Sequence, residues 1–403
     1  MTAVLFAAAT TILLWALLAR SLQRWRVAPA LVLALSGGLV AAILRFDLAE
    51  PLYSPITERA VEMILALLLF VDATEVRGGL LGRDRAAASR LVLIALPLSL
   101  AVATSAGALL LPDTSVAVLL MIACAVMPTD LSPLRVLFAN EAVPERIRHL
   151  LNVESGYNDA IVAPLFVFAL ALLEGSDTEA GLGRAMLSAC GAAVVALVVG
   201  VGVGLVVGGA ANLALKHGRT SARALGFALI MAALLAYGLA VVSDGNGFVA
   251  AFVCGIVYRL TRIDRLHGLE IELVEDVAQL CNLLVWFAFG LVFVYVFTLD
   301  LLWSTTALFA VAAVTVFRFV PVWLAMFGSS YTRRERVLIA GLGPRGTASI
   351  VFGLLAWIRV AGDDVDDASL ILITVVATVA VSLFAYSVSA VLLAARSKER
   401  TRC

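Results

Sequence analysis

Three polar clusters interrupt apolar stretches of this sequence, at residues 127–133, 154–159 and 341–347. Together they hold two aspartates, one glutamate and one arginine, with hydroxyl and amide groups beside them. A carboxylate in apolar surroundings can exchange a proton, and its oxygens, together with those of neighbouring hydroxyls, are ligands for a small hard cation. These residue types therefore indicate proton or cation chemistry inside an apolar protein.

The second cluster places its polar side chains on one side of a helix. At about 100° per residue, Glu154, Ser155, Asn158 and Asp159 fall within one arc of about 140°. Asp159 lies about eleven residues, or roughly 17 Å, after the start of this apolar stretch. That depth is close to the centre of a hydrocarbon core about 30 Å thick. We therefore expect Asp159 to be the group that takes up either a proton or a cation.

Other side chains of these clusters suit a hard cation such as Na⁺ or Li⁺. Ser155 and Thr129 supply hydroxyl oxygens, and the prolines of the first cluster leave backbone carbonyls to be satisfied by other groups. The neutral Asn158 is expected to hold the broken segment by hydrogen bonds, although simple bonding between helices also accounts for Asn158 and Ser155. Glu154 and Arg345 are interpreted as a buried ion pair, since each alone would be a costly isolated charge.

Composition places the chain among membrane proteins. Hydrophobic residues make up 62% of its 403 residues and charged residues only 14%, which is far more apolar than a soluble domain. The formal net charge of zero gives no indication of nucleic-acid binding, and the spacing of the five cysteines suggests neither a metal site nor a disulfide framework. We therefore expect one membrane unit over residues 1–403, surrounded by the lipid bilayer and without a cofactor.

Thirteen apolar stretches have the length of a helix, which predicts an all-α protein with about 13 transmembrane spans. The stretches lie near residues 2–19, 28–44, 60–72, 91–111, 115–138, 149–173, 185–215, 224–242, 247–258, 277–298, 301–327, 337–358 and 368–395. Most Lys and Arg residues fall in the odd-numbered connections, so the positive-inside rule places the N-terminus outside and the C-terminus in the cytoplasm. The expected location is the cytoplasmic membrane of a prokaryote.

The first and third polar clusters break the fifth and the twelfth stretch, which run in opposite directions across the membrane. Paired breaks of this kind predict an inverted-repeat transporter whose site lies near the bilayer midplane. The repeats would cover about 1–173 and 220–396, with a linker helix at about 185–215. Helix polarity favours Asp130 at the amino end of the inner half of the fifth span, and Arg345 at the carboxyl end of the inner half of the twelfth.

Four motifs together resemble the NhaP-type sodium/proton antiporters of the monovalent cation:proton antiporter-1 family. They are Thr129-Asp130, Glu154 with Asn158-Asp159, residues 245–252 and residues 343–346, and the similarity covers essentially the whole chain. The resemblance implies an NhaA/NhaP-like antiporter fold with discontinuous fifth and twelfth helices. It also implies a homodimer with elevator-type alternating access, in which a core domain at about 87–173 and 301–396 moves against a dimerisation domain at about 1–80 and 220–298.

Carried onto this sequence, the resemblance assigns roles to the clustered residues. Asp159 is implied as the carrier of ion and proton, with Asn158 as its partner, and such an Asn-Asp pair implies electroneutral one-for-one exchange. Thr129 and Ser155 are implied as cation ligands. Asp130 is implied as a charge that compensates for the break in the fifth helix.

Further charged residues receive less definite roles. The resemblance implies that Glu154 and Arg345 form a stabilising ion pair. Glu75, near the inner end of the third stretch, is a candidate for a cytoplasmic funnel that attracts cations, but an ordinary interfacial glutamate is the alternative. Arg318 lies inside the eleventh stretch, and the sequence indicates no partner for it.

Other functional classes fit the sequence less well. An intramembrane protease would need a catalytic aspartate pair, a Ser-His arrangement or a His-Glu-x-x-His motif, and three histidines outside the centres of the spans argue against the last two. A channel also exposes polar groups at the midplane, but two inverted breaks around one titratable carboxylate favour alternating access. We therefore predict a Na⁺ or Li⁺ antiporter rather than an enzyme. A potassium/proton antiporter and a sodium-coupled organic anion symporter are the alternatives on a similar fold.

Overall fold

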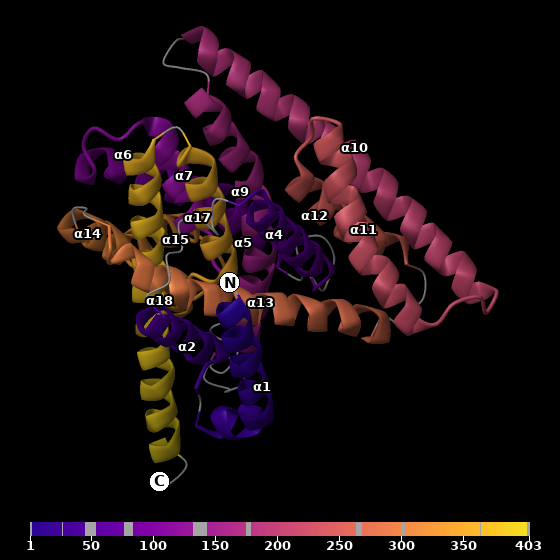
Figure 1. Cartoon of the computed structure of the whole chain (residues 1–403), viewed down its shortest axis with the longest axis horizontal. Coiled ribbons are helices and arrows are strands. Elements are labelled where there is room, and N and C mark those ends of the chain that lie inside the picture. Colours follow the sequence, from indigo (N-terminus) through magenta and orange to yellow (C-terminus); the bar gives the residue numbers. More distant parts are fainter. Residues whose placement is uncertain are drawn as a thin grey trace. The chain divides into compact units, whose positions relative to one another are not determined.

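The computed structural model describes residues 2–25, 27–44, 54–75, 84–131, 143–174, 179–262, 268–299, 303–362 and 364–400 (Figure 1). Regular structure in these ranges is helical, with no strand among them. The first helices along the chain are α1 (Thr2–Arg24), α2 (Pro29–Leu44), α4 (Pro55–Glu75), α5 (Arg85–Arg90), α6 (Leu96–Leu110), α7 (Val116–Val126) and α9 (Glu145–Glu174). They are followed by α10 (Glu179–Lys216), α11 (Ala222–Val242), α12 (Gly247–Thr261), α13 (Gly268–Val296), α14 (Trp303–Val314), α15 (Val316–Ala325), α16 (Arg333–Gly341), α17 (Thr347–Val360) and α18 (Val365–Arg400).

The lengths and apolar character of these helices confirm a membrane protein. Within the described ranges, eight helical segments are long and apolar enough to cross a bilayer. The shorter apolar helices are α2, α7, α12 and α17. Each of the thirteen predicted stretches overlaps at least one described helix. The chain is therefore an all-helical, multi-pass membrane protein, as the composition predicts.

The fourth predicted stretch is one continuous helix with a local widening. Between α5 and α6, residues Leu91–Ala95 form a π-helical turn. Pro97 follows at the start of α6, and its ring nitrogen has no hydrogen to donate to the preceding turn. A π turn absorbs this interruption without ending the helix, because its hydrogen bonds reach one residue further back along the chain.

The helices group into two compact units, and each is described by itself. The first unit contains residues Met1–Glu58, Asp84–Glu154 and Asn282–Cys403, and the second contains Arg59–Arg83 and Ser155–Cys281. Three of the four boundaries fall inside α4, α9 and α13, so these helices contribute to both units. The predicted core domain and dimerisation domain are defined differently from these two units, by how they move and how they assemble. Both domains stay predictions.

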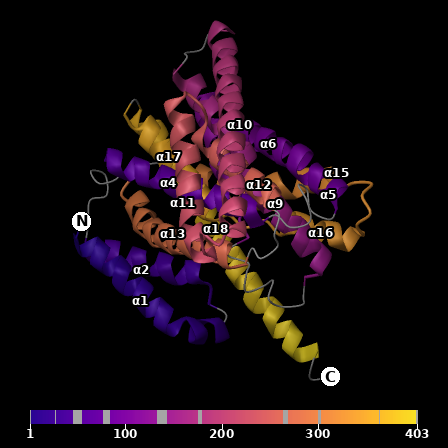
Figure 2. The ribbon, with the colours of Figure 1, turned by 90° about the vertical axis from the view of Figure 1, so that its right-hand side faces the viewer.

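In the second unit, α10, α11 and α12 pack side by side (Figures 1 and 2). Three glycines at four-residue spacing on α10, Gly200, Gly204 and Gly208, face α12. A Cβ atom on Gly200 would lie 2.6 Å from the carbonyl oxygen of Ala250, which is closer than real Cβ contacts come. The glycines therefore allow the two helix backbones to approach closely, which is how helices commonly associate in lipid.

In the same unit, a buried ion pair connects the end of α12 with the start of α13. Arg262 donates through Nε to Oε1 of Glu270 at 3.0 Å, and the hydroxyl of Tyr258 donates to the same oxygen at 3.0 Å. Arg262 also donates to the side-chain oxygen of Asn212 on α10. Because the charges are paired and hydrogen-bonded, the network can be buried without an isolated charge.

In the first unit, α18 packs against α7, α14 and α17, and α15 packs against α6 and α16. The helix α2 crosses α13 at unusually short range, because Gly37 and Gly290 lie at the contact. A Cβ atom on Gly290 would lie 2.0 Å from the carbonyl oxygen of Ala34. This unit contains both helix breaks that the sequence predicts.

Candidate ion-translocation site

The first break follows α7, which forms the first part of the fifth predicted span. α7 is capped by Ser115, whose side chain accepts a hydrogen bond from the N–H of Val118. Of its eleven residues, all but Val116 and Leu120 are buried. The helix ends before Pro128, and non-helical residues continue to residue 131, the last one described here. Thr129, the predicted cation ligand, is 2% exposed at this point.

The second break separates α16 from α17, the two parts of the twelfth predicted span. α16 begins with a capping box, in which Thr332 and Glu335 satisfy each other's backbone N–H groups. It ends at Gly341, and five non-helical residues that include Pro344 lead to α17. Residues 347–357 of α17 are all buried. Both breaks therefore lie where the sequence predicts them, at proline-containing polar clusters.

Asp130 of the first break caps the helix that follows the second break. One carboxylate oxygen, Oδ2, accepts hydrogen bonds from the N–H and the hydroxyl of Thr347, both at 3.0 Å. The N–H of Asp130 also donates to the carbonyl oxygen of Pro344 at 2.9 Å. The negative charge therefore lies at the positive amino end of α17. The inner half of the fifth span, where helix polarity predicts this charge, includes residues 132–142, which lie outside the described residues.

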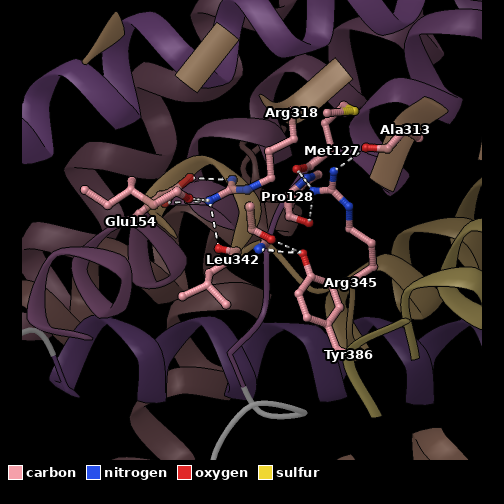
Figure 3. A network of polar contacts seen from close by, with 11 residues as sticks. Met127, Pro128, Glu154, Ala313, Arg318, Leu342, Arg345 and Tyr386 are labelled. Carbon is pink, nitrogen blue, oxygen red and sulfur yellow. Dashed lines mark hydrogen bonds and ion pairs between the residues drawn. The ribbon is translucent and has the colours of Figure 1, made fainter. Parts of the chain in front are cut away.

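Arg345 of the second break lies against the carboxyl end of α7 (Figure 3). Its guanidinium donates through Nη1 to the carbonyl oxygens of Met127 and Pro128, the latter at 3.0 Å, and through Nη2 to that of Ala313 at 2.8 Å. The side chain is 0% exposed. A cation at this position satisfies carbonyl groups that the helix break leaves without backbone partners, and it opposes the negative end of α7.

The buried partner of Glu154 is Arg318, not Arg345 (Figure 3). Arg318 binds both carboxylate oxygens of Glu154, through Nη1 at 2.7 Å and through Nη2 at 3.0 Å. Its Nη2 also donates to the carbonyl oxygen of Leu342 at 3.1 Å, at the end of α16. Arg318 therefore has both of the roles predicted for Arg345, as the partner of Glu154 and as the cation at the carboxyl end of α16. The predicted pair of Glu154 with Arg345 is wrong in its choice of arginine.

The physical reason for this correction is the local geometry of α15. The helix ladder is interrupted at Thr315, between α14 and α15, and Arg318 follows within the first turn of α15. A Cβ atom on Gly343 would lie 1.9 Å from Nε of Arg318, so the second break leaves the space that this side chain fills. A bidentate arginine is the preferred partner for a buried carboxylate. The useful signal in the sequence was Arg318 itself, since an arginine inside a span needs a carboxylate nearby.

Asp159 lies at the middle of α9, a helix of 30 residues that begins at Glu145. Its Cα lies about 21 Å along the helix axis from the start of α9, at 1.5 Å per residue. Asp159 is 5% exposed and Asn158 is 1% exposed, whereas Ser155, one turn earlier, is half-buried. The helix thus carries a buried acidic side chain and a buried amide near its middle, and their depth in the bilayer stays a prediction.

The structure brings some predicted site residues together and leaves others to prediction. Asp130 and Arg345 belong to one set of contacts around the two breaks, in the first unit. Asp159 belongs to the second unit and Thr129 to the first, so a shared cation site stays a prediction. The side chain of Glu75 lies outside the described residues. In the part of the chain that is described, no group of three or more His, Cys, Asp or Glu side chains could hold a resident metal ion.

Two broken helices that meet over buried, mutually compensating charges define this multi-pass protein as a secondary transporter with discontinuous helices. Residues 8–393 match the family model for the transmembrane sodium/hydrogen exchangers, so the chain belongs to that family.

The sodium proton antiporter MjNhaP1 from Methanocaldococcus jannaschii has a similar fold. Its structure at pH 8 is 18% identical in sequence, covers 96% of this chain and 99% of that chain, and gives a TM-score of 0.76. A second MjNhaP1 structure, from electron microscopy, is also 18% identical, covers 98% of each chain and gives a TM-score of 0.77. The predicted NhaP-type fold is confirmed.

Proposed function

We propose that this protein exchanges Na⁺ or Li⁺ for H⁺, with Asp159 as the group that carries either ion. The observation that carries the proposal is a buried carboxylate at the centre of a 30-residue apolar helix, in a chain of the sodium/hydrogen exchanger family. A carboxylate withdrawn from water binds a proton readily, and its oxygens also suit a small hard cation. Both ions compete for the same group.

The ion pair of Glu154 favours Asp159 as the carrier on α9. Arg318 binds both oxygens of Glu154, so a cation or proton on Glu154 would have to displace a buried arginine. Of two other buried glutamates, Glu270 is bound at both oxygens by the buried Arg262, through Nε at 3.0 Å and Nη2 at 3.3 Å. Glu62 accepts a hydrogen bond from Nη1 of Arg59 at 2.7 Å, although the Arg59 side chain is 59% exposed. Reversible ion exchange is therefore assigned to Asp159.

The remaining ligands are proposed from the residues around the same helix and the first break. Ser155 precedes Asp159 by four residues, so the two side chains share one face of α9. The hydroxyl of Thr129 and the amide of Asn158 complete a set of neutral oxygen donors of the kind that hard cations prefer. Asp130 contributes charge compensation at the amino end of α17 rather than a carrier group.

Charge balance explains why such a carrier exchanges ions instead of leaking them. Asp159 with a bound proton and Asp159 with a bound Na⁺ are both neutral, whereas the empty carboxylate has a charge of −1. Moving an uncompensated charge through apolar surroundings costs several kcal/mol, so only an occupied site crosses readily. One cation then returns for each proton, which makes the exchange electroneutral. We propose that the core domain performs this movement in an elevator-type cycle.

Purified protein in liposomes tests the exchange directly. With an acidic lumen and Na⁺ added outside, we expect the lumen to become alkaline, because entering Na⁺ drives protons out. Asp159→Asn should abolish the response while the protein remains monodisperse. Asp244→Asn is the matched control, since Asp244 is exposed and has a positive φ of 55° that asparagine tolerates. Retained exchange in Asp159→Asn would show that another group is the carrier.

The same vesicles decide between cations and determine the stoichiometry. Li⁺ and Na⁺ should support exchange, and a response to K⁺ alone would favour the potassium/proton alternative. Valinomycin with K⁺ should change the rate little if the exchange is electroneutral. We further propose a homodimer in a prokaryotic cytoplasmic membrane, with the N-terminus outside and the C-terminus in the cytoplasm.

A further inference from the structure

One face of α18 carries four buried hydroxyl groups at intervals of four residues. They belong to Thr374, Thr378, Ser382 and Tyr386, and none is more than 8% exposed. Residues at this spacing lie one above the other on a helix. The first two hydroxyls bond within their own helix, from Thr374 to the carbonyl of Leu370 and from Thr378 to the carbonyl of Thr374, each at 2.7 Å.

The other two hydroxyls bond the backbone of the second break instead. Figure 3 shows Tyr386 at this position. The hydroxyl of Ser382 accepts a hydrogen bond from the N–H of Arg345 at 2.8 Å. The hydroxyl of Tyr386 accepts one from the N–H of Gly343 and donates one to the carbonyl of Gly341, both at 2.8 Å. These are backbone groups that a continuous helix would have satisfied internally, and in lipid no water is present to satisfy them instead.

The contacts continue from the second break to the first. Ser382 fixes the backbone of Arg345, and the Arg345 side chain holds the carbonyl groups of Met127 and Pro128. Thr129 follows Pro128 directly. A displacement of residues 343–345 would therefore move the carbonyl groups on which the position of Thr129 depends.

We propose that Ser382 and Tyr386 are positioning residues that set the cation affinity of the transporter through the two breaks. This inference depends on the proposed function, in which Thr129 is a cation ligand and Asp159 holds the competing proton. Neither hydroxyl touches the ion. Their effect is on the backbone that presents Thr129, so they act on cation binding and not on the protonation of Asp159.

This division of roles predicts a specific kinetic pattern. If proton and cation compete, the apparent KM for Na⁺ equals the intrinsic cation constant multiplied by a factor that depends on pH. A displaced Thr129 raises the intrinsic constant and leaves that pH factor unchanged. The apparent KM should therefore rise by the same ratio at every pH, with the maximal rate nearly unchanged. A loss of folded protein would instead lower the maximal rate alone.

The test compares Tyr386→Phe and Ser382→Ala with Thr378→Val in proteoliposomes. The control removes a hydroxyl from the same face of α18, but one that bonds only its own helix among the contacts described here. Outer-shell groups typically change metal affinity by about 10–100-fold, and for these more remote contacts we expect a rise in KM of about 3- to 10-fold. Stabilisation of the purified variants by Na⁺ against heat should require correspondingly higher Na⁺ concentrations.

The outcomes separate this inference from the proposed function. If the unsubstituted protein does not respond to Na⁺, the proposed function itself fails. If it does respond, but Tyr386→Phe and Ser382→Ala keep the KM of Thr378→Val or lose only maximal rate, the positioning role is overturned. Should Tyr386→Phe fail to yield monodisperse protein, Ser382→Ala decides the question, because it removes a single hydroxyl at a separate contact.

Discussion

Asp130 and Arg345 each cap a helix that belongs to the other's break. Asp130, after α7, lies at the amino end of α17, and Arg345, before α17, lies at the carboxyl end of α7. The two breaks are therefore connected by charge as well as by the backbone bond from Asp130 to Pro344. Neither break can be rearranged by itself, because its movement would leave buried polar groups of the other break unsatisfied.

We predict that the planar guanidinium of Arg345 is essential for holding the two helix breaks together. Arg345→Lys keeps the charge, but a single ammonium group cannot reach the carbonyl groups of Met127, Pro128 and Ala313 together. Each carbonyl left unsatisfied costs about 1–3 kcal/mol. We expect a clearly lower melting temperature and weaker exchange. Arg333→Lys, at an exposed position at the start of α16, should leave both unchanged. Equal stability of the two variants would refute the capping role.

A second prediction concerns the pair of Glu154 with Arg318. Removing one partner leaves the other as a buried, uncompensated charge, which costs about 3–5 kcal/mol. Glu154→Leu and Arg318→Met should each lower the melting temperature strongly. The double variant Glu154→Leu/Arg318→Met should recover much of the loss, because no charge is left alone. Strictly additive effects in this double-mutant cycle would show that the two side chains do not depend on each other.

The positions of both breaks and the burial of Asp159 near the middle of a long helix could be predicted from the sequence, because proline and charge are rare inside apolar stretches. The partner of Glu154 could not. Arg318 and Arg345 both lie within spans, and sequence spacing gives the depth of a residue but not the neighbouring helices that its side chain reaches. The same limit applies to Ser382, since a serine hydroxyl in an apolar helix usually bonds its own backbone. Only the packing of α18 against the break distinguishes it.

A third prediction is that glycine is required at residue 343 for steric reasons. Its φ lies outside the left-handed region that favours glycine, so backbone conformation is not the cause. A Cβ atom there would lie 1.9 Å from Nε of Arg318, whose guanidinium is held by Glu154. Gly343→Ala should therefore displace Arg318 and lower the melting temperature. Gly341→Ala is the control two residues away, since a Cβ atom on Gly341 would meet nothing within 4 Å. If the two alanine variants have the same melting temperature, the space between residue 343 and Arg318 does not require glycine.

The fourth prediction concerns pH and a cluster at the start of α5. Asp84 caps α5 through the N–H of Ala87 at 3.2 Å and accepts a hydrogen bond from Arg146 at 2.8 Å. Partial burial by itself would raise the pKa of Asp84, but the bonds from Arg146 and Ala87 outweigh it, so the pKa lies below its ordinary value. Because the folded pKa is the lower one, this stabilisation is complete above the unfolded pKa of about 3.9 and is lost as the pH falls through the folded value.

Asp84→Asn should accordingly lower the melting temperature at pH 7, and the difference from the unsubstituted protein should shrink as the pH falls below about 4. The effect will be modest, because exposed pairs of this kind contribute at most about 1 kcal/mol and Arg146 is 45% exposed in its side chain. Asp113→Asn serves as the control, since Asp113 is exposed and its φ of 67° suits asparagine. A destabilisation by Asp84→Asn that stays constant from pH 7 to pH 3 would mean that the cap acts through its shape and not through its charge.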